Sequence, residues 1–138
     1  MLRYLLDTNV ISELRKLKPH GAVVAWVNTL RPEHILLSAV TMAELQAGVE
    51  LTRKNNATKA QEIEVWLNQI EASFAVLPMD SICFRQWARL MVGRSDAQLE
   101  DGMIAATAQV HELTVATRNE RDFRHFQVPV FNPFQFVA

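Results

Sequence analysis

The sequence predicts an α/β protein built on a parallel sheet of about five strands. Short apolar runs, typical of strands that are buried on both faces, alternate with longer segments of helical periodicity. The runs cover residues 2–6, 35–40, 74–78, 113–117 and 127–131. Strands that alternate with helices form parallel sheets through right-handed crossovers. A chain of 138 residues fits one domain, residues 1–138, that is large enough to bury its own core.

The composition is that of a soluble globular protein. Hydrophobic residues make up 49% and charged residues 21%, which excludes wholesale disorder. The net charge of −1 creates no overall basic field, so a nucleic-acid partner would need a local basic patch. Cys83 is the single cysteine, which excludes an intrachain disulfide and a thiolate zinc site. Without a membrane-length apolar run or a secretory leader, we expect a cytoplasmic protein with no membrane partner.

Helical segments fill the intervals between the strands. They cover residues 10–15, 22–30, 41–51, 63–70, 80–91 and 101–110. Asp80 is placed to cap the fifth of these helices, and Gly93 is a natural stop after it. The last helix is small and apolar almost all round, so it should be buried with close backbone approach. In the final strand Pro129 cannot donate a ladder hydrogen bond, which predicts an edge strand.

Four acidic residues follow the strands at the edge where their carboxyl ends meet. Asp7 ends the first strand, and Glu44 lies one turn into the helix after the second. Asp101 opens the buried alanine-rich helix, and Asp122 comes shortly after the fourth strand. Ligands of open α/β sheets bind at this edge, near the switch point of the strand order. Carboxylates gathered there repel each other unless a hard divalent cation such as Mg²⁺ or Mn²⁺ joins them.

Each acid also has an ordinary structural interpretation. Asp7 is a favourable N-cap for the helix that follows it. Thr41 and Glu44 match a capping box, in which Glu44 would only accept from the Thr41 amide. Asp101 would favour its helix N-terminus through the helix dipole. Asp122 would be a turn residue, close to local turn bonds of the Thr117–Asn119 segment.

Five segments decide between these interpretations by their order along the chain. They are Leu5–Asn9, Ser38–Leu45, Asp101–Ala108, Thr117–Phe123 and Val130–Phe134. The first four resemble the successive motifs of PIN-domain ribonucleases, and the last resembles the bacterial VapC/FitB-type toxins of toxin–antitoxin pairs. Each segment alone is weak, whereas the ordered set is specific and extends over essentially the whole chain.

The resemblance implies both a fold and an activity. The expected fold is a three-layer α/β/α sandwich with sheet order 3-2-1-4-5, which places Asp7 beside the switch point. The expected activity is that of a Mg²⁺- or Mn²⁺-dependent endoribonuclease toxin acting on an RNA substrate. The expected partners are a second copy in a homodimer and a small, DNA-binding antitoxin that neutralises the toxin.

Carried over position by position, the resemblance assigns three groups of residues. The acidic quartet, expected to bind metal and act in catalysis, is Asp7, Glu44, Asp101 and Asp122. The polar residues expected to orient ligands or water are Asn9, Ser38, Thr117 and Asn119. The arginines expected to contact RNA phosphates or an acidic antitoxin segment are Arg118, Arg121 and Arg124. Two residues depart from the expected pattern: Gly102 lies in a first helical turn, and Glu112 stands where a glycine is usual.

Two alternatives to the nuclease remain open from the sequence. In a phosphatase of the haloacid-dehalogenase kind, Asp7 would be the nucleophile. That chemistry needs a second acid two residues further on, where this chain has Asn9. The other alternative is a PIN-like module that has lost activity and only binds RNA or a protein partner.

Overall fold

A computed structural model describes residues 2–138 and contains one parallel five-stranded sheet. Its strands are β1 (Tyr4–Leu6), β2 (Ile35–Ser38), β3 (Ala75–Leu77), β4 (Thr114–Ala116) and β5 (Val130–Phe131). Their order is β3-β2-β1-β4-β5, and every neighbouring pair is parallel. The strand order that the resemblance implied is therefore confirmed, and Asp7 directly follows the central strand.

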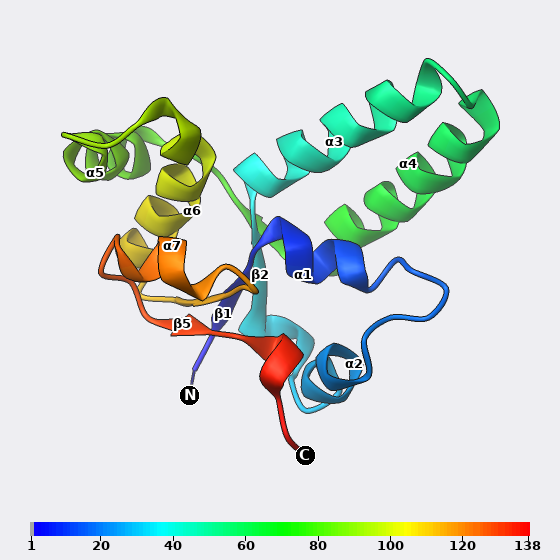
Figure 1. Cartoon of the computed structure of the whole chain (residues 1–138), viewed down its shortest axis with the longest axis horizontal. Coiled ribbons are helices and arrows are strands. Elements are labelled where there is room, and N and C mark those ends of the chain that lie inside the picture. The colour runs from blue at the N-terminus through cyan, green and yellow to red at the C-terminus, as the bar shows by residue number, and fades with distance from the viewer. Residues whose placement is uncertain (1) are drawn as a thin grey trace.

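Helices cover both faces of the sheet (Figure 1). They are α1 (Thr8–Glu13), α2 (Gly21–Val27), α3 (Ala39–Arg53), α4 (Ala57–Ser73), α5 (Ser81–Met91), α6 (Leu99–Val110) and α7 (Glu120–Arg124). Three 3₁₀ turns complete the fold: η1 (Pro32–His34), η2 (Asp96–Gln98) and η3 (Pro133–Gln135). In Figure 1, α5, α6 and α7 lie on one side of the sheet, and α1 and α2 lie on the other.

Successive side chains of the central strands belong to two separate hydrophobic cores, one on each face of the sheet. Leu5 and Leu36 point into a core formed with Ile104 and Phe123, beneath α6 and α7. Leu6 belongs to the opposite core, beneath α1 and α2. This alternation follows from the pleat, because successive side chains of a strand point to opposite faces. The three-layer α/β/α sandwich is thus built by apolar side chains on both faces of short strands.

The boundary between β2 and α3 differs from the sequence prediction. The strand ends at Ser38, whose hydroxyl accepts from the Val40 amide at 3.1 Å and so caps a helix that already begins at Ala39. Thr41 is consequently a buried residue inside the helix, and the capping-box interpretation of Thr41 and Glu44 is wrong. The apolar run predicted as strand through residue 40 continues into the helix, and an apolar run alone does not separate the two structures.

Other boundaries also moved. Helix α4 is much longer than the predicted 63–70, because Asn56 caps it by accepting from the Lys59 amide at 3.0 Å. Helix α6 begins at Leu99, so Asp101 lies within its first turn rather than opening it. Helix α7 was not predicted, and it places Asp122 in a helix instead of a turn. Strand β5 lies at the edge of the sheet, as Pro129 predicted. Pro129 has no N–H to donate, and its carbonyl accepts from the Val115 amide of β4 at 2.9 Å.

The α6–β4 connection explains one departure from the family pattern. Glu112 has a φ of 56°, in the left-handed region that glycine adopts at low cost. The next amide, of Leu113, donates to the Ala108 carbonyl at 2.8 Å and closes the helix end. A non-glycine residue in this conformation costs about 1–2 kcal/mol, and the chain carries that cost at an exposed residue of the helix-to-strand turn.

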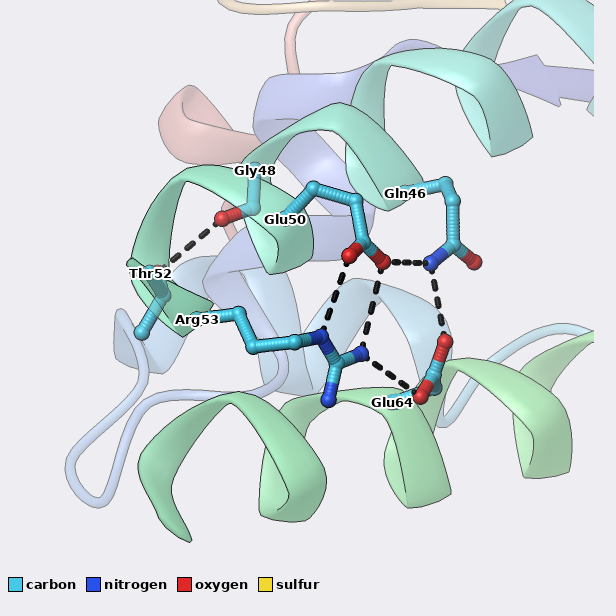
Figure 2. A network of polar contacts seen from close by, with 6 residues as sticks. All are labelled: Gln46, Gly48, Glu50, Thr52, Arg53 and Glu64. Carbon is cyan, nitrogen blue, oxygen red and sulfur yellow. Dashed lines mark hydrogen bonds and ion pairs between the residues drawn. The ribbon is translucent and has the colours of Figure 1, made fainter. Parts of the chain in front are cut away.

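Helices α3 and α4 form an antiparallel arm that reaches away from the sheet (Figure 1). Arg53 near the end of α3 donates to Glu50 at 3.0 Å and, across the arm, to Glu64 at 2.8 Å. Gln46 donates to the same two carboxylates at 2.7 and 2.8 Å (Figure 2). We refer to Gln46, Glu50, Arg53 and Glu64 as the α3–α4 network. None of the helices described for residues 2–138 is both long and apolar enough to cross a membrane.

Candidate functional site

Asp7 is held rigidly at the carboxyl end of the central strand. Its side chain is only 5% exposed, and its own amide donates to the Ala116 carbonyl of β4 at 2.9 Å. Oδ1 accepts from the Thr8 amide at 2.8 Å, so Asp7 is also the N-cap residue of α1. The capping interpretation of Asp7 is therefore confirmed, and it is compatible with a functional role because the other carboxylate oxygen faces different partners.

Two polar residues orient that second oxygen of Asp7. Oδ2 accepts from the Thr117 hydroxyl at 2.9 Å and from the Asn9 amide group at 3.1 Å. Asn9 also accepts from the Arg118 amide at 3.2 Å, which ties the end of β1 to the loop after β4. Burial raises the pKa of Asp7 above its usual value, and these hydrogen bonds oppose the rise only in part. The supporting positions predicted for Asn9 and Thr117 agree with this geometry.

The other two predicted supporting residues lie differently. Ser38 is fully buried and caps α3, so its oxygen serves the helix start. Asn119 is exposed, and its backbone N–H donates to the Thr117 hydroxyl at 2.9 Å. That contact is the local turn bond expected of this segment, and it helps to fix the Thr117 hydroxyl that in turn donates to Asp7.

Glu44 points from α3 toward α1. Its Oε1 accepts from the Thr8 hydroxyl at 2.8 Å, and the same hydroxyl lies 3.2 Å from the Thr41 hydroxyl. Partial burial raises the pKa of Glu44, and the negative charges of Asp7 and Glu100 raise it further. The sequence interpretation paired Glu44 with the Thr41 amide and missed Thr8, whose hydroxyl donates to this acid. The adjacency of Thr8 to Asp7 was the available signal, but its partner Glu44 is 36 residues away.

The pKa of Asp101 is influenced by the charges of the other three acids. Asp101 lies half-buried in the first turn of α6, and its pKa is raised to about 6. Burial is the largest cause, followed by the charges of Asp7, Asp122 and Glu44. The structure therefore brings the other three predicted acids, from three different elements, near enough to Asp101 for their charges to act on it. A favourable contact with the helix dipole does not explain Asp101, because such a contact lowers the pKa of a carboxyl.

The three arginines beside this site have different surroundings. Arg124 forms an ion pair with Glu120 at 2.9 Å, one turn away in α7. The guanidinium of Arg118 stacks on the Phe134 ring, 4.0 Å from its centre. Among the ion pairs found within residues 2–138, none involves Arg121. Arg121 and Asp122 are both exposed on α7, at the rim of the site.

The donor chemistry of the quartet suits a hard divalent cation. All four side chains offer carboxylate oxygens, which Mg²⁺ and Mn²⁺ prefer. Asp7 accepts three hydrogen bonds, which leaves about one of roughly four acceptor positions of a carboxylate for a metal. Within residues 2–138 no three His, Cys, Asp or Glu side chains are close enough to hold an ion between them as they stand. Mg²⁺ is usually held by one or two carboxylates and keeps several waters, so this arrangement fits it.

A groove of about 300 Å³ extends from the acids along the α3–α4 arm. Thr8 and Glu44 line its end at the site, and Arg15 of the α1–α2 connection lies along it. Its apolar wall is formed by Leu45, Val49, Ile63 and Trp66. A ligand in this groove would lie directly beside Glu44.

Comparison with known proteins identifies the family. The model of the PIN domain matches residues 4–128. The chain belongs to the PIN-domain family. Toxin FitB of Neisseria gonorrhoeae is 43% identical over 94% of this chain and 97% of FitB. VapC ribonuclease Y4jK of Sinorhizobium fredii is 35% identical over 94% of this chain and 96% of Y4jK.

Solved structures of this family agree with the fold. The structure of FitAcB from Neisseria gonorrhoeae matches with a TM-score of 0.86 and 41% identity, over 96% of this chain and 99% of that one. The structure of FitAB bound to an IR36 DNA fragment matches with a TM-score of 0.85 and 38% identity, over 98% of both chains. The predicted membership of the PIN family, among relatives of the VapC/FitB type, is thereby confirmed.

Proposed function

We propose that the protein is a Mg²⁺- or Mn²⁺-dependent endoribonuclease that acts as the toxin of a toxin–antitoxin pair. The observation that carries this proposal is the gathering of acids at the carboxyl edge of the sheet, where the Thr8 amide and hydroxyl join Asp7 to Glu44. Burial, and then the charges of Asp7, Asp122 and Glu44, raise the pKa of Asp101 there to about 6. The names of the relatives, a toxin and a VapC ribonuclease, agree with this use of the acids. RNA as the substrate also places the protein in the cytoplasm.

Asp7 and Asp101 would hold the ion, with Glu44 and Asp122 as further ligands. When bound there, such an ion would supply activation of water and stabilisation of the negative charge that develops on a phosphodiester. The neighbouring groups of the chain fix the ligands: Thr117 and Asn9 orient Asp7, as Thr8 orients Glu44. Such outer partners maintain the direction and basicity of metal-binding carboxylates.

The exposed arginines of this region would contact RNA phosphates or an acidic antitoxin segment. Arg121 is the best placed of the three, because Arg124 is paired with Glu120 and Arg118 is stacked on Phe134. A stacked guanidinium keeps its outward N–H groups available, so Arg118 can also bind a phosphate. Substituting either arginine should weaken RNA binding and reduce its dependence on salt.

We place a segment of the antitoxin in the groove between α1, α3 and α4. The groove has an apolar wall and is also lined by Glu44 and Arg15, which suits an amphipathic helix or extended segment of a partner. A bound segment would cover Glu44 and so block access to the acids. The protein would also form a homodimer. Light scattering of the purified chain, alone and with its antitoxin, measures both assemblies.

Cleavage of RNA by the purified protein tests the activity. The wild type should cleave RNA with Mn²⁺ or Mg²⁺ and stop when a chelator is added. Asp7→Asn keeps the shape of the side chain and removes the ligand charge, so it should lose at least about 100-fold in rate, the upper range for loss of a group that merely orients a ligand. Expression without antitoxin should arrest growth for the wild type and not for Asp7→Asn at equal protein level.

The same experiment separates the alternatives. A trapped acyl-phosphate on Asp7 would favour the phosphatase, although Asn9 donates to Asp7 where that chemistry needs a second acid. A wild type that binds RNA and never cleaves it, with every metal tried, would be the inactive binding module. Full cleavage by Asp7→Asn would remove Asp7 from the proposed metal site.

A further inference from the structure

Helix α5 packs across the first turn of α6, the turn that carries Asp101. The indole Nε1–H of Trp87 in α5 donates to the carbonyl of Leu99, the first residue of α6, at 3.2 Å. Within the described chain the side chain of Gln98, the N-cap residue of α6, makes no capping hydrogen bond. A neighbouring helix therefore fixes the start of α6 through Trp87.

Gly102 allows this close packing. A Cβ atom at residue 102 would lie 2.6 Å from the Met91 sulfur and 3.3 Å from Cδ1 of Trp87. A side chain there would push α5 and α6 apart or displace both of these residues. This explains the glycine that stands in a first helical turn against its low helix propensity.

Asp101 and Gly102 face different neighbours because successive helical residues are turned by about 100°. Gly102 is buried against Trp87 and Met91, whereas Asp101 is half-buried and within reach of the charges of Asp7, Asp122 and Glu44. Asp101 lies in the same first turn of α6 whose Leu99 carbonyl accepts from Trp87. Asp7 is fixed independently in the sheet by Thr117 and Asn9.

We propose that Trp87 is a positioning residue for the metal site: its indole N–H and its contact with Gly102 set the place of Asp101 relative to Asp7. This inference rests on the proposed metal-dependent function. The indole N–H of Trp87 donates to the Leu99 carbonyl, so Trp87 would act on Asp101 through the first turn of α6. The edge of the Trp87 ring is itself held by Phe84, whose ring lies 6.0 Å away at 87°.

Trp87→Phe tests the role of the indole N–H, since phenylalanine keeps an aromatic ring between α5 and α6. The variant should fold and bind Mn²⁺ roughly ten-fold more weakly than the wild type in calorimetric titration, the lower range for groups that orient metal ligands. In the metal-free protein, amide hydrogen exchange in the first turn of α6 should be faster. That second measurement does not depend on metal or activity.

Trp26→Phe is the matched control. Trp26 is buried in the core on the opposite face of the sheet, against Tyr4 and Phe131, so the same chemical change there should lower the melting temperature. It should leave Mn²⁺ binding unchanged. Equal weakening of Mn²⁺ binding in both variants would show a general stability effect and would overturn the positioning role.

Gly102→Ala provides a second test that does not depend on Trp87→Phe folding. Alanine favours a helix more than glycine does, but its Cβ would meet the Met91 sulfur at 2.6 Å. A structural effect alone would therefore change the melting temperature and leave Mn²⁺ binding as in the wild type. The positioning role predicts weaker Mn²⁺ binding all the same, and recovery when Met91→Ala is added to remove the closest contact. Unchanged Mn²⁺ binding in both Trp87→Phe and Gly102→Ala would overturn the proposal. A wild type that binds no Mn²⁺ would instead overturn the metal site itself, and the positioning role with it.

Discussion

The protein contains two clusters of carboxylates with opposite electrostatics. In the α3–α4 network, Glu50 and Glu64 accept from Arg53 and Gln46, and these donors lower the pKa of both carboxyls. In the acidic quartet, the partners are neutral hydroxyls, amides and other acids, and the pKa values of Asp7, Glu44 and Asp101 are raised. The first cluster is complete within the chain. Within residues 2–138 no positive charge contributes to the pKa values of the second cluster, which agrees with the cation proposed for it.

Helix α3 carries one acid of each cluster, so the two clusters can be compared within a single helix. Glu44 and Glu50 lie six positions apart in α3 and have the same chemistry, but only Glu50 has an arginine beside it. A carboxylate paired with arginine stabilises the native arm, although an exposed pair contributes little. A carboxylate that faces other acids destabilises the native state, and such a group persists when a ligand or reaction requires it.

Among the substitutions that compare the two clusters, Glu44→Gln has the largest expected effect. Glu44→Gln keeps a hydrogen-bond acceptor for Thr8 and removes the charge, so the protein should fold and lose between about 10- and 100-fold of its RNA cleavage. Glu50→Gln on the same helix is the matched control and should keep full cleavage. Rates measured with saturating Mn²⁺ distinguish them. Equal rates for Glu44→Gln and the wild type would take Glu44 out of the site.

The topology of the sheet could be predicted from the sequence better than the boundaries of its helices. The meeting of Asp7 and Asp101 was predictable because parallel strands deliver their carboxyl ends to one edge. The start of α3 was not, since the apolar run of β2 continues into the helix. Helix α7 has five residues, too few for a helical period to show in the sequence.

Tertiary contacts account for the remaining differences. Gly102 looked like a weak helix former and is required by Met91 and Trp87, which approach from another helix. The partner of Glu44 proved to be Thr8 rather than the Thr41 amide, three residues away in the chain. Sequence periodicity describes contacts within an element, and these contacts join separate elements.

The pH dependence of stability should distinguish the two clusters. The pKa of Asp101 rises from 3.8 to about 6 on folding, so the native state binds this proton more tightly than the unfolded state. The resulting destabilisation is fully present above pH 6 and disappears as the pH falls toward 3.8. Metal-free protein should therefore gain stability between pH 7 and pH 5, by about 1 kcal/mol after discounting for the solvent screening of a half-exposed group.

Asp101→Asn should remove most of this gain, and denaturant unfolding at several pH values measures it. The α3–α4 network acts in the opposite direction at lower pH. The pKa values of Glu50 and Glu64 lie below 4.5 in the folded protein, so their contribution is lost only as the pH falls below that value. A wild type whose stability is flat from pH 7 to pH 5 would contradict the assigned repulsion.

The smallest expected effect concerns the arm. Arg53→Gln removes the cation shared by Glu50 and Glu64 and should lower the melting temperature by a few degrees, since exposed pairs are weak unless they form a network. Arg31→Gln removes an isolated exposed pair with Glu33 and should have no measurable effect. Both variants should respond to Mn²⁺ as the wild type does. A lost response in Arg53→Gln would couple the arm to the acids.

Thermal melting of the wild type and Asp101→Asn, each with chelator and with Mn²⁺, tests most directly that the quartet is arranged for a cation. Saturating Mn²⁺ should raise the wild-type melting temperature, since a ligand that binds only the native state at one hundred times its Kd adds about 2.7 kcal/mol. Asp101→Asn should melt higher than the wild type in chelator, because repulsion is relieved, and gain less from Mn²⁺. An Asp101→Asn protein that melts lower in chelator and gains as much from Mn²⁺ as the wild type would contradict the account.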